Sequence, residues 1–305
     1  MSDDAPPRST TPTAEAPGHD LEVSESHHAR VGRIEVRRAL PRRGRRSIGP
    51  WCFADHMGPA DVAEESGLDV GPHPHIGLQT VTWLIEGQAL HRDSLGTQQV
   101  IAPGQLNLMT AGHGVAHAEE ATGRYRGTLQ GIQLWIALPD ASRDGPAAFE
   151  HFDDLPTIDL SAGRATVFMG DFHGLASPAR HDSELVALDL ALRGEIILPL
   201  RPDYDHGLVV LEGSLVVNGR ALAPGHLGYL RPGRDELTLR AGPATRAILL
   251  GGVPLSEPLF MWWNFVARTR HEIDAAYDAW VHGDERFSTV TSDLARIGAP
   301  TPYWR

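Results

Sequence analysis

Two short histidine motifs hold the side chains best suited to chemistry. His73 and His75 are separated by one proline, and His117 and Glu119 by one alanine. In extended backbone, residues i and i+2 point to the same face of a strand, so each pair projects its side chains together. On neighbouring strands, the two pairs would bring three imidazoles and one carboxylate around one point. That donor set predicts a transition-metal site, and an octahedral ion there keeps two positions for water, O2 or substrate.

Each motif has a simpler interpretation when it is taken alone. An HxH pair is more often two surface histidines on a sheet edge, and an HxE pair is a weaker signal still. Their joint occurrence in one half of the chain favours the metal interpretation. The second half contains His206 and His226 but no HxH motif, so we interpret both as structural or solvated and expect that half to be metal-free.

Composition excludes several other chemistries. The 305 residues include 27 basic residues, all of them arginine, and a single cysteine, Cys52. The absence of lysine excludes Schiff-base and Walker-type lysine chemistry, and one cysteine excludes an internal disulfide and cysteine-rich metal sites. The net charge of −12 argues against direct binding of nucleic acid, which needs clustered positive charge.

The elements that must position the motifs are mostly strands. Short runs rich in β-branched and aromatic residues lie between glycine and proline turns, for example 78–85, 131–138, 185–192 and 207–211. Leu84-Ile85-Glu86-Gly87 followed by Ala102-Pro103-Gly104 resembles Val210-Leu211-Glu212-Gly213 followed by Ala223-Pro224-Gly225. This internal repeat predicts an all-β protein with two copies of one fold, divided near residue 150.

One helix is predicted near the end of the chain. Thr269 and Glu272 have the spacing of a capping box, and Gly283 is a stop signal. Between them, Ile273, Ala276, Tyr277, Trp280 and Val281 follow the period of an amphipathic helix. Such a helix must dock its apolar face on one of the β-domains.

The ends and the hydropathy of the chain predict its location. Residues 1–22 are rich in proline and polar residues, which predicts a disordered tail without the apolar core of a secretory signal. No run approaches the length of a membrane span. We therefore expect a cytoplasmic protein without membrane contact.

The motifs also resemble those of a known family. The segments GPHPHIGLQTVTWLIEG, HRDSLG and PGQLNLMTAGHGVAHAE, with FADHMGP upstream, are similar to the pirin family of bicupins. The resemblance implies two cupin barrels (double-stranded β-helix, or jelly-roll) and a C-terminal helix. It places the metal-binding N-terminal cupin domain at residues 23–148 and a metal-free C-terminal cupin domain with the helix at 149–305. Its HPH and HAE motifs fall on His73, His75, His117 and Glu119, with Glu119 supplying the carboxylate that other cupins place at the position of Gln79.

The resemblance further implies a function. Pirins bind one divalent transition metal, usually Fe(II), with Mn, Co, Ni, Cu or Zn as alternatives. We expect a metal-dependent dioxygenase that cleaves a flavonol such as quercetin with O2, with Glu119 as ligand and proton acceptor. The alternatives are a metal-dependent redox or stress regulator that acts through a protein partner, and another oxygenase or isomerase on the same scaffold.

Several other residues have two interpretations. His91-Arg92-Asp93-Ser94 forms either a layer behind the metal ligands or a polar wall at the cavity, or else a solvated loop. His113 either lines the mouth or lies in solvent. Six arginines between Arg37 and Arg46 form either an anion-binding loop or, as we favour, a solvated loop paired with Asp61, Glu64 and Glu65. The Trp262, Trp263 and Phe265 cluster is either an aromatic lid or an interdomain core.

Overall fold

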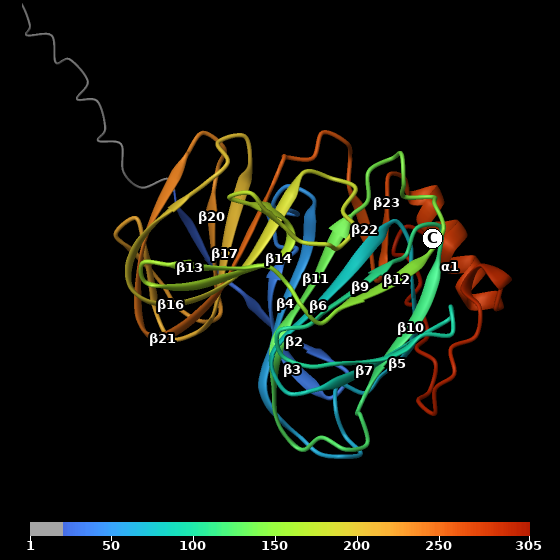
Figure 1. Ribbon diagram of the computed structural model, residues 1–305. Helices are drawn as coiled ribbons and strands as arrows, with labels where there is room; N and C mark the ends of the chain where they lie inside the picture. Colours follow the sequence, from blue (N-terminus) through green and yellow to red (C-terminus); the bar gives the residue numbers. More distant parts are fainter. Residues whose placement is uncertain (1–20) are drawn as a thin grey trace, which may run out of the picture.

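The computed structural model describes residues 21–305, which form two β-domains side by side (Figure 1). The predicted disordered tail lies outside the described residues except for its last two. Of these, Leu21 is buried and Glu22 begins a strand. No helix in the described part of the chain is both long and apolar enough to cross a bilayer.

The first domain consists of a seven-stranded and a four-stranded antiparallel sheet. The order of the larger sheet is β12 (Ala148–Phe152), β9 (Leu106–Thr110), β6 (Leu78–Glu86), β11 (Gly127–Ala137), β4 (Trp51–Val62), β3 (Ile34–Leu40) and β2 (His27–Val31). The order of the smaller sheet is β5 (Val70–His75), β10 (Val115–Glu120), β7 (Ala89–Asp93) and β8 (Gln98–Ile101). The smaller sheet carries both predicted histidine motifs.

The second domain repeats this arrangement. Its main sheet runs through β1 (Glu22–Glu25), β20 (His226–Leu230), β17 (Asp205–Glu212), β21 (Glu236–Gly252), β16 (Leu185–Pro199), β14 (Gly163–Phe172) and β13 (Thr157–Leu160). The short strands β15 (Leu175–Ala176), β18 (Leu215–Val217) and β19 (Arg220–Leu222) pair beside this path. The order β9-β6-β11-β4-β3 in the first domain matches β20-β17-β21-β16-β14 in the second, with the repeated glycine turns after β6 and β17. The prediction of two cupin domains is confirmed.

Strand β11 shows why these strands are apolar on both faces. Ile132, Leu134 and Ile136 belong to a core cluster that also contains Ile248 and Leu250 of the second domain. The alternate residues of β11 face the interior of the first domain. Because both faces are buried, residues 131–137 of β11 form a continuous apolar run that is interrupted only by Gln133, which lines the cavity.

Each domain is completed by a terminal segment of the chain that crosses to it. Strand β1 pairs with β20 of the second domain. The C-terminal segment, residues 260–305, packs on the first domain through β22 (Phe260–Trp262), β23 (Phe265–Ala267), α1 (Arg270–His282) and the 3-10 turn η1 (Glu285–Phe287). It lies beside β5 and β10 in Figure 1, where Phe265 forms a β-bridge with Ile76.

The predicted helix is confirmed together with its caps. The Thr269 hydroxyl accepts from the Glu272 backbone N–H, and Gly283 ends the helix in the left-handed conformation at φ 71°. Ile273, Ala276 and Trp280 are buried. Val281, which the periodicity also placed on the apolar face, is 47% exposed, because it lies at the edge of the stripe formed by the buried Ile273, Ala276 and Trp280.

Candidate metal centre

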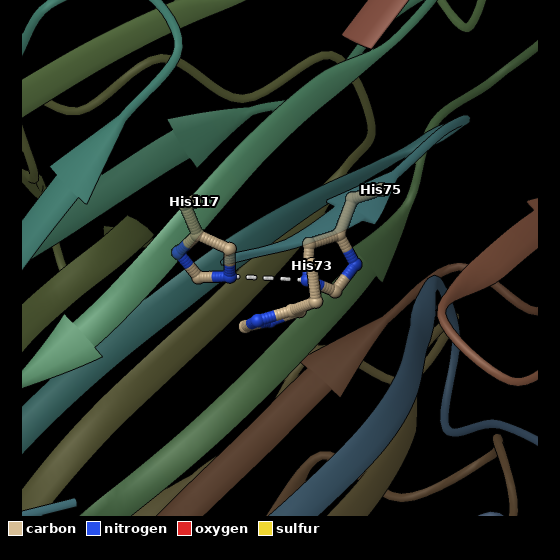
Figure 2. A group of neighbouring side chains, drawn as sticks. All are labelled: His73, His75 and His117. Carbon is tan, nitrogen blue, oxygen red and sulfur yellow. Dashed lines mark hydrogen bonds between the residues drawn. The ribbon is translucent and has the colours of Figure 1, made fainter. Parts of the chain in front are cut away.

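The strand register brings the two histidine motifs together. Strands β5 and β10 are antiparallel neighbours in which His117 is directly opposite His73. The three imidazoles of His73, His75 and His117 are buried and lie side by side in Figure 2. Their ligand atoms all lie within 4.8 Å of one another. The structure therefore has a three-histidine cluster suited to a metal ion.

The outer nitrogen of each imidazole has its own partner. His73 Nδ1 lies 2.9 Å from the Gly71 carbonyl oxygen, and His75 Nδ1 lies 3.1 Å from the Asn264 carbonyl oxygen. A carbonyl only accepts, so both Nδ1 atoms carry the proton and both Nε2 atoms keep a lone pair. The hydrogen bonds therefore orient His73 and His75 as metal ligands.

His117 is oriented through a relay of two further residues. His91 Nε2 donates to Asp93 at 3.0 Å, and His117 Nδ1 lies 3.4 Å from His91 Nδ1. Because His91 gives its proton to the carboxylate, its Nδ1 accepts from His117 Nδ1–H and leaves His117 Nε2 free. Burial acts to raise the pKa of Asp93, but hydrogen bonds from His91 and the Thr97 backbone outweigh it and lower that pKa. His91 and Asp93 thus support His117 from behind, and no residue of the His91 to Ser94 segment is in the cavity lining.

The electrostatics of the cluster fit a cation. Burial lowers the pKa of His73 to about 4. Burial, with the neighbouring imidazoles, lowers the pKa values of His75 and His117 well below the ordinary value. All three imidazoles are therefore neutral at pH 7, which is the form that binds metal. The Nε2 atoms of His75 and His117 stand 3.1 Å apart (Figure 2), and a cation between them would balance the two lone pairs.

Glu119 is placed differently from the histidines. It lines the cavity beside them, yet among the described residues it is not part of the group within 4.8 Å. Two steps along β10 from His117 to Glu119 correspond to three steps along β5 from His73 to Val70, which marks a bulge between them. Burial raises the pKa of Glu119 to about 7, so its carboxyl is poised between the protonated and ionised forms near neutral pH.

The histidines open into a cavity of about 350 Å³, within the range of about 300–1,000 Å³ that is typical of small-molecule sites. Phe53 and Trp135 stack in its wall with ring centroids 4.0 Å apart, and Trp135 contacts His75 edge-on at 5.1 Å. The remaining lining residues come from strands β2 to β5 and the turns between them, from β11 and from the C-terminal segment: Arg30, Val31, Gly32, Val36, Arg38, Asp55, Met57, Leu68, Val70, Gln133, Trp263, Asn264 and Ile297.

The C-terminal segment is a part of the cavity that the motifs did not predict. Trp263, Asn264 and Ile297 lie in the wall, and the Ile297 backbone N–H donates to the Pro72 carbonyl at 2.9 Å. The aromatic sequence around Trp262 was the available signal. The residues of this aromatic sequence have different roles. Trp263 lines the cavity, whereas Phe265 is buried in a core cluster with Ile273 and Trp280.

Other predicted residues lie away from the cavity. His113 is exposed and its carbonyl accepts from Arg286. Gln79 donates to Thr110 and to the Arg180 carbonyl, which points its amide toward the second domain. Burial raises the pKa of Cys52 to about 12, which fits a core residue.

The arginine-rich segment, of which Arg37 and Arg38 lie in strand β3 and not in a loop, pairs with other acids than expected. Arg38 pairs with Asp55 and Arg45 with Glu22. Of the three acids proposed as partners, Glu64 pairs with Arg126 instead.

Comparisons with known proteins agree with this architecture and site. The pirin family model matches residues 33–136, and the model of the pirin C-terminal cupin domain matches residues 185–287. A Pseudomonas aeruginosa protein named "Putative quercetin 2,3-dioxygenase PA1205" is 48% identical over 277 residues, which cover 90% of this chain and 88% of that protein. A Caulobacter vibrioides pirin-like protein is 34% identical over 86% of this chain and 93% of its own length.

A solved structure gives the same result. The crystal structure of quercetin 2,3-dioxygenase from Acinetobacter baumannii superposes with a TM-score of 0.91 and 40% identity, covering 93% of this chain and 96% of that one. Two cupin domains in this strand order, the three-histidine cluster in the first of them and these matches identify the chain as a member of the pirin family.

Proposed function

We propose that this pirin is a metal-dependent dioxygenase that cleaves flavonols such as quercetin with O2. The observation that carries the proposal is the three-histidine cluster at the wall of a cavity of about 350 Å³ with stacked aromatic side chains. A cavity of this size and lining suits a flat, multi-ring ligand. Two of the similar proteins bear the name of this activity.

The proposed ligands are His73, His75, His117 and Glu119, and the proposed metal is Fe(II), with Mn, Co, Ni, Cu or Zn as alternatives. When bound, a divalent metal supplies Lewis-acid polarisation that lowers the pKa of the flavonol 3-hydroxyl. His91 and Asp93 hold His117 in the tautomer that binds, and Asn264 does the same for His75. The Phe53 and Trp135 rings orient a planar substrate and exclude water from its face.

Glu119 is the proposed proton acceptor of the site. Burial raises its pKa to about 7 in the metal-free site, and the carboxylate would take the hydroxyl proton after moving away from the metal.

Two further proposals rest on the sequence alone. One is the domain division between residues 148 and 149, and the other is a cytoplasmic location.

The decisive experiment combines metal analysis with oxygen uptake. The purified protein, loaded separately with Fe, Mn, Co, Ni and Cu, is expected to consume O2 only when quercetin is added, with at least one of these metals. Absence of uptake in all five forms contradicts the dioxygenase proposal and favours a regulatory role through a protein partner.

Variants test the ligand assignment separately. His73→Ala and His117→Ala are expected to lose the metal, whereas His113→Ala, which changes an exposed histidine outside the cavity, retains it. Glu119→Gln distinguishes the two roles of that residue, because a lost ligand lowers metal content and a lost base lowers kcat at unchanged metal content. Full metal content in both His→Ala variants would contradict the site.

A further inference from the structure

The wall opposite the smaller sheet is built in rows. On β4 and β11, Phe53 pairs with Trp135 and Asp55 pairs with Gln133, while Arg38 of β3 pairs with Asp55. Since alternate residues share a face, Phe53 and Trp135 form an aromatic row, and Arg38, Asp55 and Gln133 form a polar row. All five side chains belong to residues that line the cavity. The rows are two residues apart, or about 6–7 Å along the strands.

The aromatic row is the one that contacts the metal centre, through Trp135 and His75 at 5.1 Å. A multi-ring substrate bound at the histidines would therefore meet the aromatic row first and, two residues further along the strands, the polar row. Among the described residues, the polar row holds none of the histidines, because its side-chain hydrogen bonds run among its own members and to Thr82.

Asp55 fixes the orientation of the Arg38 guanidinium. Arg38 Nε and Nη2 donate to the two oxygens of Asp55 at 2.8 and 2.7 Å, and the guanidinium lies 4.6 Å above the Phe53 ring. The Asp55 side chain is 2% exposed, whereas that of Arg38 is 25% exposed. A bidentate pair uses two of the five N–H donors of arginine. Arg38, which lines the cavity, thus keeps three N–H donors beyond this pair.

Gln133 presents the same chemistry beside it. Its Oε1 accepts from the Thr82 hydroxyl at 2.9 Å, which turns the amide NH2, with two donors, away from that bond. The polar row therefore offers N–H donors, those of Arg38 on a guanidinium that is paired with Asp55, beside the aromatic row. A buried ion pair adds little to stability, because the cost of desolvating the two charges offsets their attraction. The position of the Arg38–Asp55 pair in the cavity lining therefore favours a role in ligand recognition.

We propose that Arg38, held by Asp55 and assisted by Gln133, is a specificity-determining residue that binds a phenolic or anionic oxygen of the aromatic substrate, distinct from the oxygens that reach the histidines. The proposal rests on the proposed function and narrows it to flavonols with hydroxyl groups on their outer rings. Quercetin carries such hydroxyls, whereas 3-hydroxyflavone keeps the 3-hydroxy-4-keto unit and lacks them.

The test is equilibrium binding of these two flavonols without O2. The full chain loaded with Ni(II) is titrated with each flavonol, and we expect it to bind quercetin more tightly. Arg38→Met is expected to weaken quercetin binding about tenfold or more, the magnitude for a charge-assisted hydrogen bond, and 3-hydroxyflavone binding less than about twofold. Arg37→Met is the matched control, because the neighbouring Arg37 is outside the cavity lining and donates to the Gly58 carbonyl instead.

A second variant separates the loss of substrate recognition from a folding defect in Arg38→Met. Arg38→Met leaves Asp55 buried and unpaired, so the double variant Arg38→Gln with Asp55→Asn keeps a neutral hydrogen-bonding pair and is expected to lose the same preference. Equal weakening of both flavonols, or an unchanged preference in the double variant, overturns the proposal. Turnover in air is measured in parallel: an Arg38-dependent preference without turnover retains the recognition role and contradicts only the dioxygenase proposal.

Discussion

At the scale of single residues, the site depends on groups that fix other groups. The metal cluster uses three imidazoles, but their useful tautomers are set by two backbone carbonyls and by His91 with Asp93. Such outer partners commonly change metal affinity by about 10–100-fold when they are removed. Metal binding by the three histidines therefore depends on about twice as many residues as the histidines themselves.

Trp263 carries a second residue-scale feature, a strained backbone in the cavity wall. Its φ is 53°, in the two-residue loop between the paired residues Trp262 and Phe265. This left-handed conformation is unfavourable for a bulky side chain and is enriched in active sites and ligand-binding loops.

The strain predicts an inverted order of stability for two variants. Trp263→Ala and Trp263→Gly both remove the indole, but only alanine keeps the Cβ that the conformation disfavours. We expect the glycine variant to be more stable than the alanine variant by about 1 kcal/mol, the reverse of the usual order. Urea denaturation measures the difference, and an alanine variant of equal or greater stability would contradict it.

At the scale of elements, the C-terminal segment closes the first domain over the metal centre. The backbone of Ile297 bonds to Pro72, next to His73, and the Trp280 indole donates to the Ile297 carbonyl at 2.9 Å. Gly71 allows this close approach: a Cβ there would lie 2.0 Å from the Ala295 carbonyl oxygen. The same glycine supplies the carbonyl that orients His73.

Gly71→Ala is therefore expected to displace the segment. Overpacking against backbone costs about 1–3 kcal/mol, and the movement of the Gly71 carbonyl should also weaken metal binding. Thermal denaturation and metal titration measure the two effects. Gly298→Ala in the same segment is the matched control, because a Cβ at Gly298 has no neighbour within 4 Å; a similar loss in both variants would contradict the explanation.

At the scale of the whole molecule, the two domains are joined by a shared core and a buried polar bridge. The Trp83 indole donates to Asp189 at 2.8 Å, and Asp189 also accepts from Arg246 at 2.5 Å. Trp83 stacks on Phe168 of the second domain at 4.8 Å. A buried polar contact of this kind, once satisfied on both sides, holds the two domains in one arrangement.

Buried neutral histidines in both domains predict a loss of stability in acid. Burial lowers the pKa of His206 to about 4, although Asp203 opposes the shift, and burial lowers that of His56 to about 3. Between the ordinary pKa near 6.5 and these values, only the unfolded chain binds the proton, so the free energy of unfolding falls as pH falls. The expected slope is at most about 1.4 kcal/mol per pH unit for each histidine.

His206→Gln isolates one of these contributions. The variant cannot take up this proton in either state, so its stability should fall less than that of the parent chain between pH 6.5 and 4. Urea denaturation at several pH values in this window, with pH 7.5 as the reference, measures both slopes. Parallel slopes for the two proteins would contradict the assignment.

The sequence by itself determined what depends on local periodicity. The two-residue spacing of His73 with His75 placed both side chains on one strand face, and the caps at Thr269 and Gly283 placed the ends of α1. The repeated glycine turns indicated two copies of one fold, and the structure has the same strand order in both. Each of these features follows from backbone geometry within a few residues.

Only the tertiary structure decided which distant segments meet at the site. The Asn264 carbonyl that orients His75 lies 189 residues further along the chain, and no local pattern relates the two. The bulge beside Glu119, the exposure of Val281 and the pairing of Arg38 with Asp55 are likewise set by how strands and termini return to one another. Register and packing between segments carry this information, because they arise from burial of the whole core rather than from any one stretch of sequence.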